Sequence, residues 1–156
     1  MASNRHLGRI VALQTLYEYE FRKESADASA DVNEILSRNL ERYETAIDDT
    51  TFVKTLVTGV LEEQAGIDEK IQPIAPDWPI DQIARVDRNI LRLGVYELLN
   101  QGDVVPPKVA INEAVELAKA FGSDNSSKFV NGVLGTAYRT LVEGAENGDT
   151  TDTTVR

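Results

Sequence analysis

The fold of this chain is decided by three stretches near its C-terminal end: VDRNILRLGVYEL at residues 86–98, KVAINEAVELAK at residues 108–119, and KFVNGVL at residues 128–134. Apolar side chains recur in each stretch at spacings of three and four residues, the period of an amphipathic helix. Pro107 stands where a first-turn proline belongs, and Gly122 has the position of a helix-ending glycine. We therefore predict helices over 87–100, 107–121 and 126–142.

The N-terminal half shows the same helical period. Residues 5–23 predict a first helix, and the Ala/Ser/Asp-rich residues 24–31 predict a loop. A shorter helix is expected from Val32. Asp48 and Asp49 are N-cap candidates for a third helix, which we expect to continue to Ile74.

Proline residues interrupt this pattern once, at Pro73, Pro76 and Pro79, with Trp78 among them. Because proline lacks an amide hydrogen and restricts the residue before it, we predict a boundary between two lobes near 73–79, with Trp78 close to it. No segment shows the alternation of a strand, so the predicted class is all-α. We expect one domain over residues 1–143 and a disordered polar tail over 144–156.

Charge is distributed unevenly along the chain. The net charge is −10, which on its own argues against a nucleic-acid partner. Before Tyr17, however, the chain carries Arg5, His6 and Arg9 and no acidic residue, and the acids begin at Glu18. A basic end on an acidic body suits phosphate contacts at one edge and a basic protein partner elsewhere.

Several kinds of chemistry are not encoded. The sequence has no cysteine, no phosphate-binding loop and no dinucleotide-binding glycine motif. His6 is the single histidine, which leaves only carboxylates for a metal or a catalytic site. We read most of these carboxylates as solvated helix faces and expect no enzymatic activity, no cofactor and no metal. The chain also lacks an apolar run long enough to cross a bilayer and an apolar signal segment, so a cytoplasmic location without membrane association is expected.

Together, the three stretches and the segment ALQTLY at residues 12–17 closely resemble the NusB family. The resemblance is strong over residues 86–134 and moderate over residues 5–21. It implies two small helical bundles packed side by side, with about six to seven helices in all. It also implies a transcription antitermination factor that binds boxA-type single-stranded RNA together with NusE, a ribosomal protein of the small subunit. The complex acts on elongating RNA polymerase, notably during ribosomal RNA transcription.

The resemblance implies two groups of RNA-binding residues. Arg5, His6 and Arg9 match the basic N-terminus of the family, although Leu7 and Gly8 interrupt the usual basic run. The second group opens the last predicted helix and consists of Asn125, Ser126, Lys128 and Phe129. Backbone amides and a lysine there attract phosphate, and an aromatic ring can stack on an unpaired base. The alternatives are a solvated, frayed N-terminus and a Phe129 that belongs to the core.

The resemblance places four further residues where relatives meet NusE: Tyr17, Phe21, Asp81 and Asp87. A tyrosine is a typical interface anchor, and rim acids steer a basic partner. The alternatives are core packing for the two aromatic residues and helix capping for the two aspartates. Asn112 and Glu113 match the family pattern without an assigned contact.

One competing function remains open. A protein-interaction adaptor with little RNA binding of its own would also explain the acidic charge and the thinned N-terminal arginines. The oligomeric state, including a homodimer, is not determined by the sequence.

Overall fold

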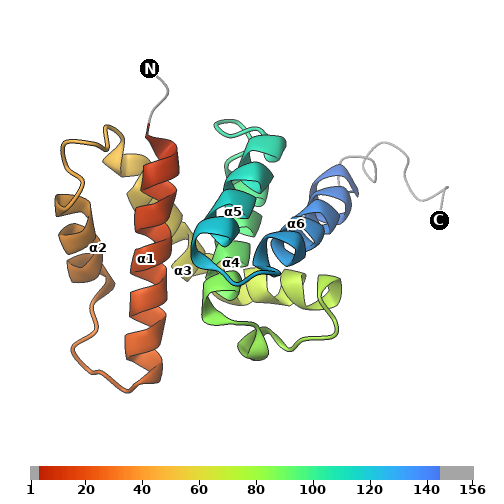
Figure 1. Cartoon of the computed structure of the whole chain (residues 1–156), viewed down its shortest axis with the longest axis horizontal. Helices are drawn as coiled ribbons and strands as arrows, with labels where there is room; N and C mark the ends of the chain where they lie inside the picture. Colours follow the sequence, from red (N-terminus) through yellow and green to blue (C-terminus); the bar gives the residue numbers. More distant parts are fainter. Residues whose placement is uncertain (1–3, 145–156) are drawn as a thin grey trace. The chain divides into compact units, whose positions relative to one another are not determined.

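The computed structural model describes residues 4–144, in which every regular element is a helix and no strand occurs. Six α-helices and two shorter helical turns follow one another along these residues: α1 Arg5–Glu24, α2 Val32–Glu41, α3 Thr50–Ile74, the 3₁₀ turn η1 Ile80–Gln82, α4 Arg85–Asn100, α5 Pro107–Phe121, α6 Ser126–Ala137 and the π-helical η2 Tyr138–Glu143 (Figure 1). The all-α prediction is confirmed. Among residues 4–144, no helix has both the length and the apolar content that crossing a membrane requires.

The described residues fall into two compact units that divide between Glu63 and Gln64, inside α3. Sequence reasoning expected the boundary near residues 73–79, whereas that segment lies wholly within the second unit. The prolines do not separate it from this unit because Pro73 is still part of α3 and Ala75 donates a backbone hydrogen bond to Ile71. The predicted disordered tail, apart from Gly144, lies outside the described residues.

The first unit is built on the contact between α1 and α2, which run side by side (Figure 1). A buried hydrogen bond from Asn39 Nδ2 to Thr15 Oγ1, 3.1 Å long, ties the two helices together. Asp31 caps α2 by accepting from the amides of the next turn. The predicted capping role of Asp49 is confirmed, since its Oδ1 accepts from the Phe52 amide at 3.0 Å.

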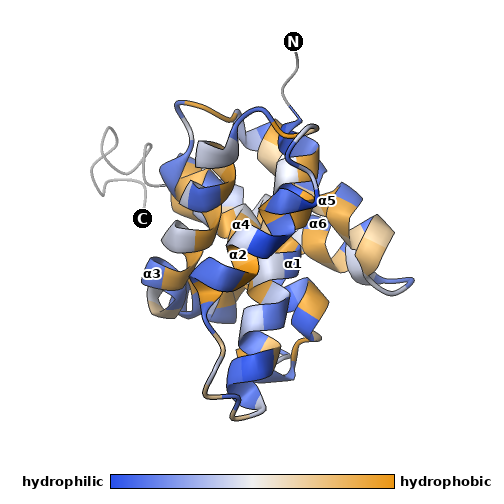
Figure 2. Ribbon diagram, turned by 90° about the vertical axis from the view of Figure 1, so that its left-hand side faces the viewer, coloured by the Kyte–Doolittle hydropathy of each residue, from blue (hydrophilic) through white to orange (hydrophobic). Residues whose placement is uncertain are grey.

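The second unit is organised around α4, which packs against both α5 and α6. Every residue of α4 from Arg88 to Leu98 is buried. A helix enclosed on all sides is normally apolar, whereas α4 also encloses charged residues. One of them, Arg92, forms two parallel hydrogen bonds of 2.8 and 2.9 Å with the carboxylate of Asp68 on α3. The hydropathy colouring shows the alternation of apolar and polar residues along the helices (Figure 2).

Gly94 allows α4 and α6 to approach closely. A Cβ atom at this position would lie 2.6 Å from Cδ1 of Leu134, a fully buried residue of α6. Gly66 in α3 is the contrasting case, because nothing lies within 4 Å of a Cβ added there. The two glycines therefore share the low helix propensity of their residue type but differ in the space around them.

We predict opposite effects for alanine at these two positions. Gly66→Ala should raise the free energy of unfolding by about 0.5–1 kcal/mol, because only helix propensity changes. Gly94→Ala should lower it by up to about 2 kcal/mol, because overpacking against Leu134 outweighs the same propensity gain. Urea unfolding followed by circular dichroism measures both values. Equal stabilisation by the two substitutions would contradict a close α4–α6 contact.

Candidate nucleic-acid interface

The start of α1 is held in place by residues of the first unit. The Asn4 side chain donates a hydrogen bond to the carbonyl of Ala46, and Arg5 lies 3.8 Å from the carboxylate of Asp49. The guanidinium of Arg5 lies over the Phe52 ring, 4.8 Å from its centroid. These contacts order the N-terminal turn, in contrast to the frayed end considered from sequence.

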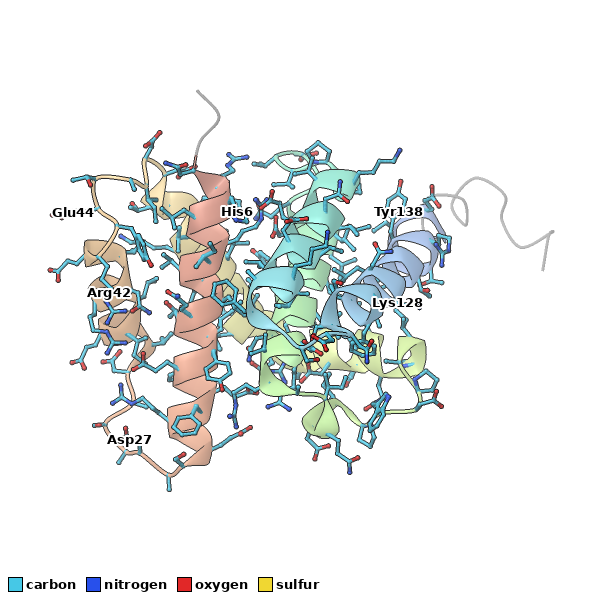
Figure 3. All side chains as sticks on the ribbon, viewed as in Figure 1. His6, Asp27, Arg42, Glu44, Lys128 and Tyr138 are labelled. Carbon is cyan, nitrogen blue, oxygen red and sulfur yellow. The ribbon has the colours of Figure 1, made fainter. Side chains whose placement is uncertain are left out.

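The three basic residues of this turn differ in exposure. Arg5 is partly exposed and His6 is exposed, with His6 projecting at the top of α1 (Figure 3). Arg9 is only 3% exposed, and its guanidinium lies 5.1 Å from the Phe52 centroid. Enclosure of this cation on an aromatic ring favours a structural role for Arg9 over the RNA contact that the resemblance implied, and that contact stays a prediction. Arg5 and His6 remain available at this end.

The turn between α5 and α6 owes its shape to Gly122 and Ser126. A Cβ on Gly122 would lie 2.5 Å from the Ser126 side chain, so the close approach requires glycine, although its φ of −93° does not. Ser126 Oγ accepts a hydrogen bond of 2.8 Å from the Ser123 amide. Ser126 is 2% exposed and its hydroxyl organises the turn, which favours a structural role over the RNA contact predicted from sequence.

The other three residues predicted at this turn remain accessible. Asn125 and Lys128 are exposed, and Lys128 projects from the first turn of α6 (Figure 3). Phe129 is half-buried, and its amide donates a hydrogen bond to the Asn125 carbonyl at 3.1 Å. Neither alternative for Phe129 is realised fully, because one part of its side chain packs inward and another lines the surface.

A hollow of about 270 Å³ opens beside this turn, within the second unit. Its walls come from α4, α6 and the segments before them: Trp78, Gln82, Ile83, Ala84, Asp87, Ser123, Asn125, Ser126 and Phe129. The structure thus brings Asp87, predicted as a partner contact, together with the RNA-binding candidates Asn125 and Phe129. It also adds Trp78, which sequence reasoning assigned to a lobe boundary.

The remaining partner-binding candidates lie at the surface. Tyr17 is 37% exposed and Phe21 is 49% exposed, so core packing does not account for either residue. Asp81 is exposed in η1. Asp87 belongs to the first turn of α4, whose N-cap residue is Ala84, so Asp87 is not the cap that sequence reasoning offered as the alternative. Tyr17 and Phe21 belong to the first unit, and the two aspartates belong to the second.

A network of charges fixes the end of α1 that carries Phe21. Arg22 donates to Asp27 at 2.7 Å and to Glu18 at 3.2 Å, and Glu18 also accepts from Arg38. Hydrogen bonds from the Ser29 hydroxyl and then from Arg22 lower the pKa of Asp27 to about 2. Two acids near this end of α1, Glu18 and Asp27, are thus engaged within the unit. Residues 4–144 contain no group of three histidine or acidic side chains arranged to hold a metal ion.

Comparison with known proteins places this arrangement in a family. The model of the NusB family matches residues 6–139, which is most of the chain. The chain belongs to the NusB family. The match covers both units and includes every residue considered above as an RNA or partner contact except Arg5.

Individual relatives agree with this assignment. The transcription antitermination protein NusB of Chloroflexus aggregans is 42% identical over 149 residues, covering 94% of this chain and 95% of the relative. The structure of T. maritima NusB is 34% identical with a TM-score of 0.76, covering 87% of this chain and 91% of that one. A structure of the antitermination factors NusB and NusE in complex with dsRNA is 29% identical with a TM-score of 0.75, covering 90% of this chain and 99% of that chain.

The enclosed position of Arg9 predicts a structural role that differs from that of its neighbour His6. Arg9→Ala should lower the free energy of unfolding by about 2 kcal/mol, the size of a desolvated cation–π contact. His6→Ala, at an exposed position of the same helix turn, should change it by no more than about 0.5 kcal/mol. Thermal and urea unfolding of both variants measure the difference. If Arg9→Ala were as stable as the wild type, Arg9 would have to be counted again among the surface cations.

Proposed function

We propose that this NusB-family chain is a transcription antitermination factor that binds boxA-type single-stranded RNA together with NusE. The observation that carries the proposal is the similarity, across both units, to a chain from the solved complex of NusB and NusE with dsRNA. The complex acts on elongating RNA polymerase, notably during ribosomal RNA transcription, and therefore works in the cytoplasm. It binds and positions nucleic acid without catalysing a reaction.

Two surfaces supply the RNA contacts in this proposal. Arg5 and His6 lie at the start of α1, where the helix dipole adds partial positive charge and the first turn of α1 carries no acidic residue. Asn125, Lys128 and Phe129 open α6, where Lys128 neutralises a phosphate and the Phe129 ring meets a base. An asparagine at position 125 accepts and donates hydrogen bonds beside a phosphate without repelling it.

The NusE contacts in this proposal come from the exposed aromatic residues of α1 and from the acid in η1. Tyr17 and Phe21 are one helical turn apart, so both rings lie on the same face of α1. Exposed rings of this size are typical anchors of a protein interface. Asp81, which belongs to the second unit, is a further proposed NusE contact, and the net charge of −10 favours the approach of a basic ribosomal protein.

A second function, an adaptor with little RNA binding of its own, is favoured by one observation. Burial of Arg9 leaves Arg5 and His6 as the basic residues at the surface of the first helix turn. RNA affinity grows with the number of phosphates neutralised, and this small number of cations therefore predicts weak binding by the chain alone. Fluorescence anisotropy of labelled boxA-type RNA, with the chain alone and with NusE added, separates the two functions. Antitermination predicts strong binding by the pair, and the adaptor predicts no more binding than NusE gives alone.

The role of Arg5 can be measured through salt. For RNA binding by the chain–NusE complex, the slope of log Kd against log salt concentration should be smaller by about 0.7 in Arg5→Gln, because one phosphate contact is lost. Arg38→Gln is the matched control, since Arg38 is an exposed arginine of α2 in the same unit that, like Arg5, is paired with a carboxylate, here that of Glu18 in the later half of α1. Its salt slope should equal that of the wild type. Identical slopes for all three proteins would remove Arg5 from the RNA site.

The role of Phe21 can be measured with NusE alone. Phe21→Ala should weaken NusE binding by about 2 kcal/mol or more, as expected for an aromatic interface anchor, with little change in melting temperature. Phe121→Ala provides the control, because Phe121 is also about half exposed but lies at the end of α5 in the second unit. Isothermal titration calorimetry gives both affinities. Equal affinities for the two variants would show that the α1 face is not the NusE site.

A further inference from the structure

Trp78 is the single tryptophan of the chain, and 54% of the residue's surface is exposed to solvent. An indole at this exposure leaves much of its large apolar face in water, which is unfavourable for folding alone. The residue lies between Pro76 and Pro79 in the segment that joins α3 to η1. Its exposure leaves the indole available for a contact at the surface of the second unit.

Trp78 and Phe129 together form a wall between two hollows. Both residues line the hollow of about 270 Å³ beside Asp87 and Asn125. Both also line a neighbouring hollow of about 320 Å³, which reaches Lys128. These volumes lie close to the lower bound for small-molecule pockets, a size that suits a single flat ring.

The segment that carries Trp78 is held by side chains from two helices. Gln72 Nε2 on α3 donates to the Trp78 carbonyl at 2.8 Å, and Gln72 Oε1 accepts from the Ile80 amide at 2.9 Å. From α4, Arg88 Nη1 donates to the carbonyls of Ile80 at 3.3 Å and Ile83 at 2.9 Å. The exposed indole is thus mounted on an ordered backbone, which lowers the entropy cost of binding a partner against it.

The charges around the wall favour a nucleobase as the occupant. Lys128 offers a cation at the second hollow, where the phosphate joined to a bound base can be neutralised. Asp87 contributes a carboxylate to the first hollow, and its Oδ1 has no hydrogen-bond partner within residues 4–144. A carboxylate repels a phosphate but accepts hydrogen bonds from the amino group of a base. A base inside, with its phosphate beside Lys128, satisfies both charges.

We propose that Trp78 and Phe129 form an aromatic site that takes one unpaired nucleobase of the bound RNA. The base stacks on the indole and the phenyl ring, and Asp87 favours a base that carries an amino group. Gln72 is a positioning residue that acts through the backbone of Trp78. This inference deepens the proposed function and rests on it, because it names a further contact of the same RNA.

The fluorescence of Trp78 itself reports on RNA binding at this site. In the chain–NusE complex, the indole emission should fall when unlabelled boxA-type RNA is added, because a stacked base quenches tryptophan. The same titration with Trp78→Phe gives the contribution of any NusE fluorescence, which is subtracted. Anisotropy of end-labelled RNA measures binding independently. Quenching that follows the anisotropy curve supports the site, whereas full binding with unchanged Trp78 emission overturns it.

Affinity of the variants gives a second readout. Trp78→Leu keeps apolar bulk but loses the aromatic face, so it should weaken RNA binding roughly 5- to 150-fold, the range for one lost base stack. Trp78→Phe should recover most of this loss. Gln72→Ala should weaken binding and reduce quenching together. Phe121→Leu, at an exposed aromatic residue that lines neither hollow, should bind as the wild type does. Wild-type affinity in Trp78→Leu would overturn the site.

Different results would contradict the proposed function and the aromatic site. If the wild-type complex binds boxA-type RNA no better than NusE alone, the proposed function is wrong, and the aromatic site falls with it. If the wild-type complex binds well while Trp78→Leu retains full affinity, only the aromatic site is wrong. Melting temperatures of all variants identify any loss of folding.

Discussion

The two arginines buried on α4 are the constraint on which the second unit depends. Arg92 pairs with Asp68 of α3, and Arg88 donates to carbonyls of the segment before α4. Burying such cations is costly unless their donors find partners, so these bonds hold the part of α3 around Asp68, and residues 80–83, against α4 within the second unit. The backbone that carries Trp78 is positioned by the hydrogen bonds of Arg88 to this segment. The surface proposed to bind RNA is therefore shaped by contacts inside the second unit.

The predicted RNA-binding residues likewise divide into enclosed residues and surface residues. Arg9 and Ser126 lie inside, where one stacks on Phe52 and the other binds the Ser123 amide. Arg5, His6, Lys128 and Phe129 lie wholly or partly at the surface. A match to a family's binding motif thus includes enclosed residues that shape the surface as well as accessible residues that are proposed to touch the ligand. Burial distinguishes the two groups, because a phosphate reaches only an accessible cation.

Sequence reasoning predicted the helices well because their apolar period is a local property. The helices at 5–23 and 107–121 and the Asp49 cap follow from neighbouring residues alone. Burial of Arg9 depends on Phe52 from α3, and enclosure of Ser126 depends on the missing Cβ of Gly122. Prolines at 73–79 suggested a boundary because sequence reveals where a helix is interrupted, but not where contacts are fewest. The exposure of Trp78 could not be predicted from sequence, because it depends on which residues surround the indole in three dimensions.

The central claim is that RNA contacts the start of α1 and the start of α6, while NusE contacts the α1 face that carries Tyr17 and Phe21. Amide chemical-shift mapping of the isotopically labelled chain tests this most directly, first with unlabelled NusE and then with boxA-type RNA added. The account predicts NusE-induced shifts near Tyr17 and Phe21, followed by RNA-induced shifts near Arg5 and over residues 123–129. RNA-induced shifts confined to the Tyr17 and Phe21 face would contradict it.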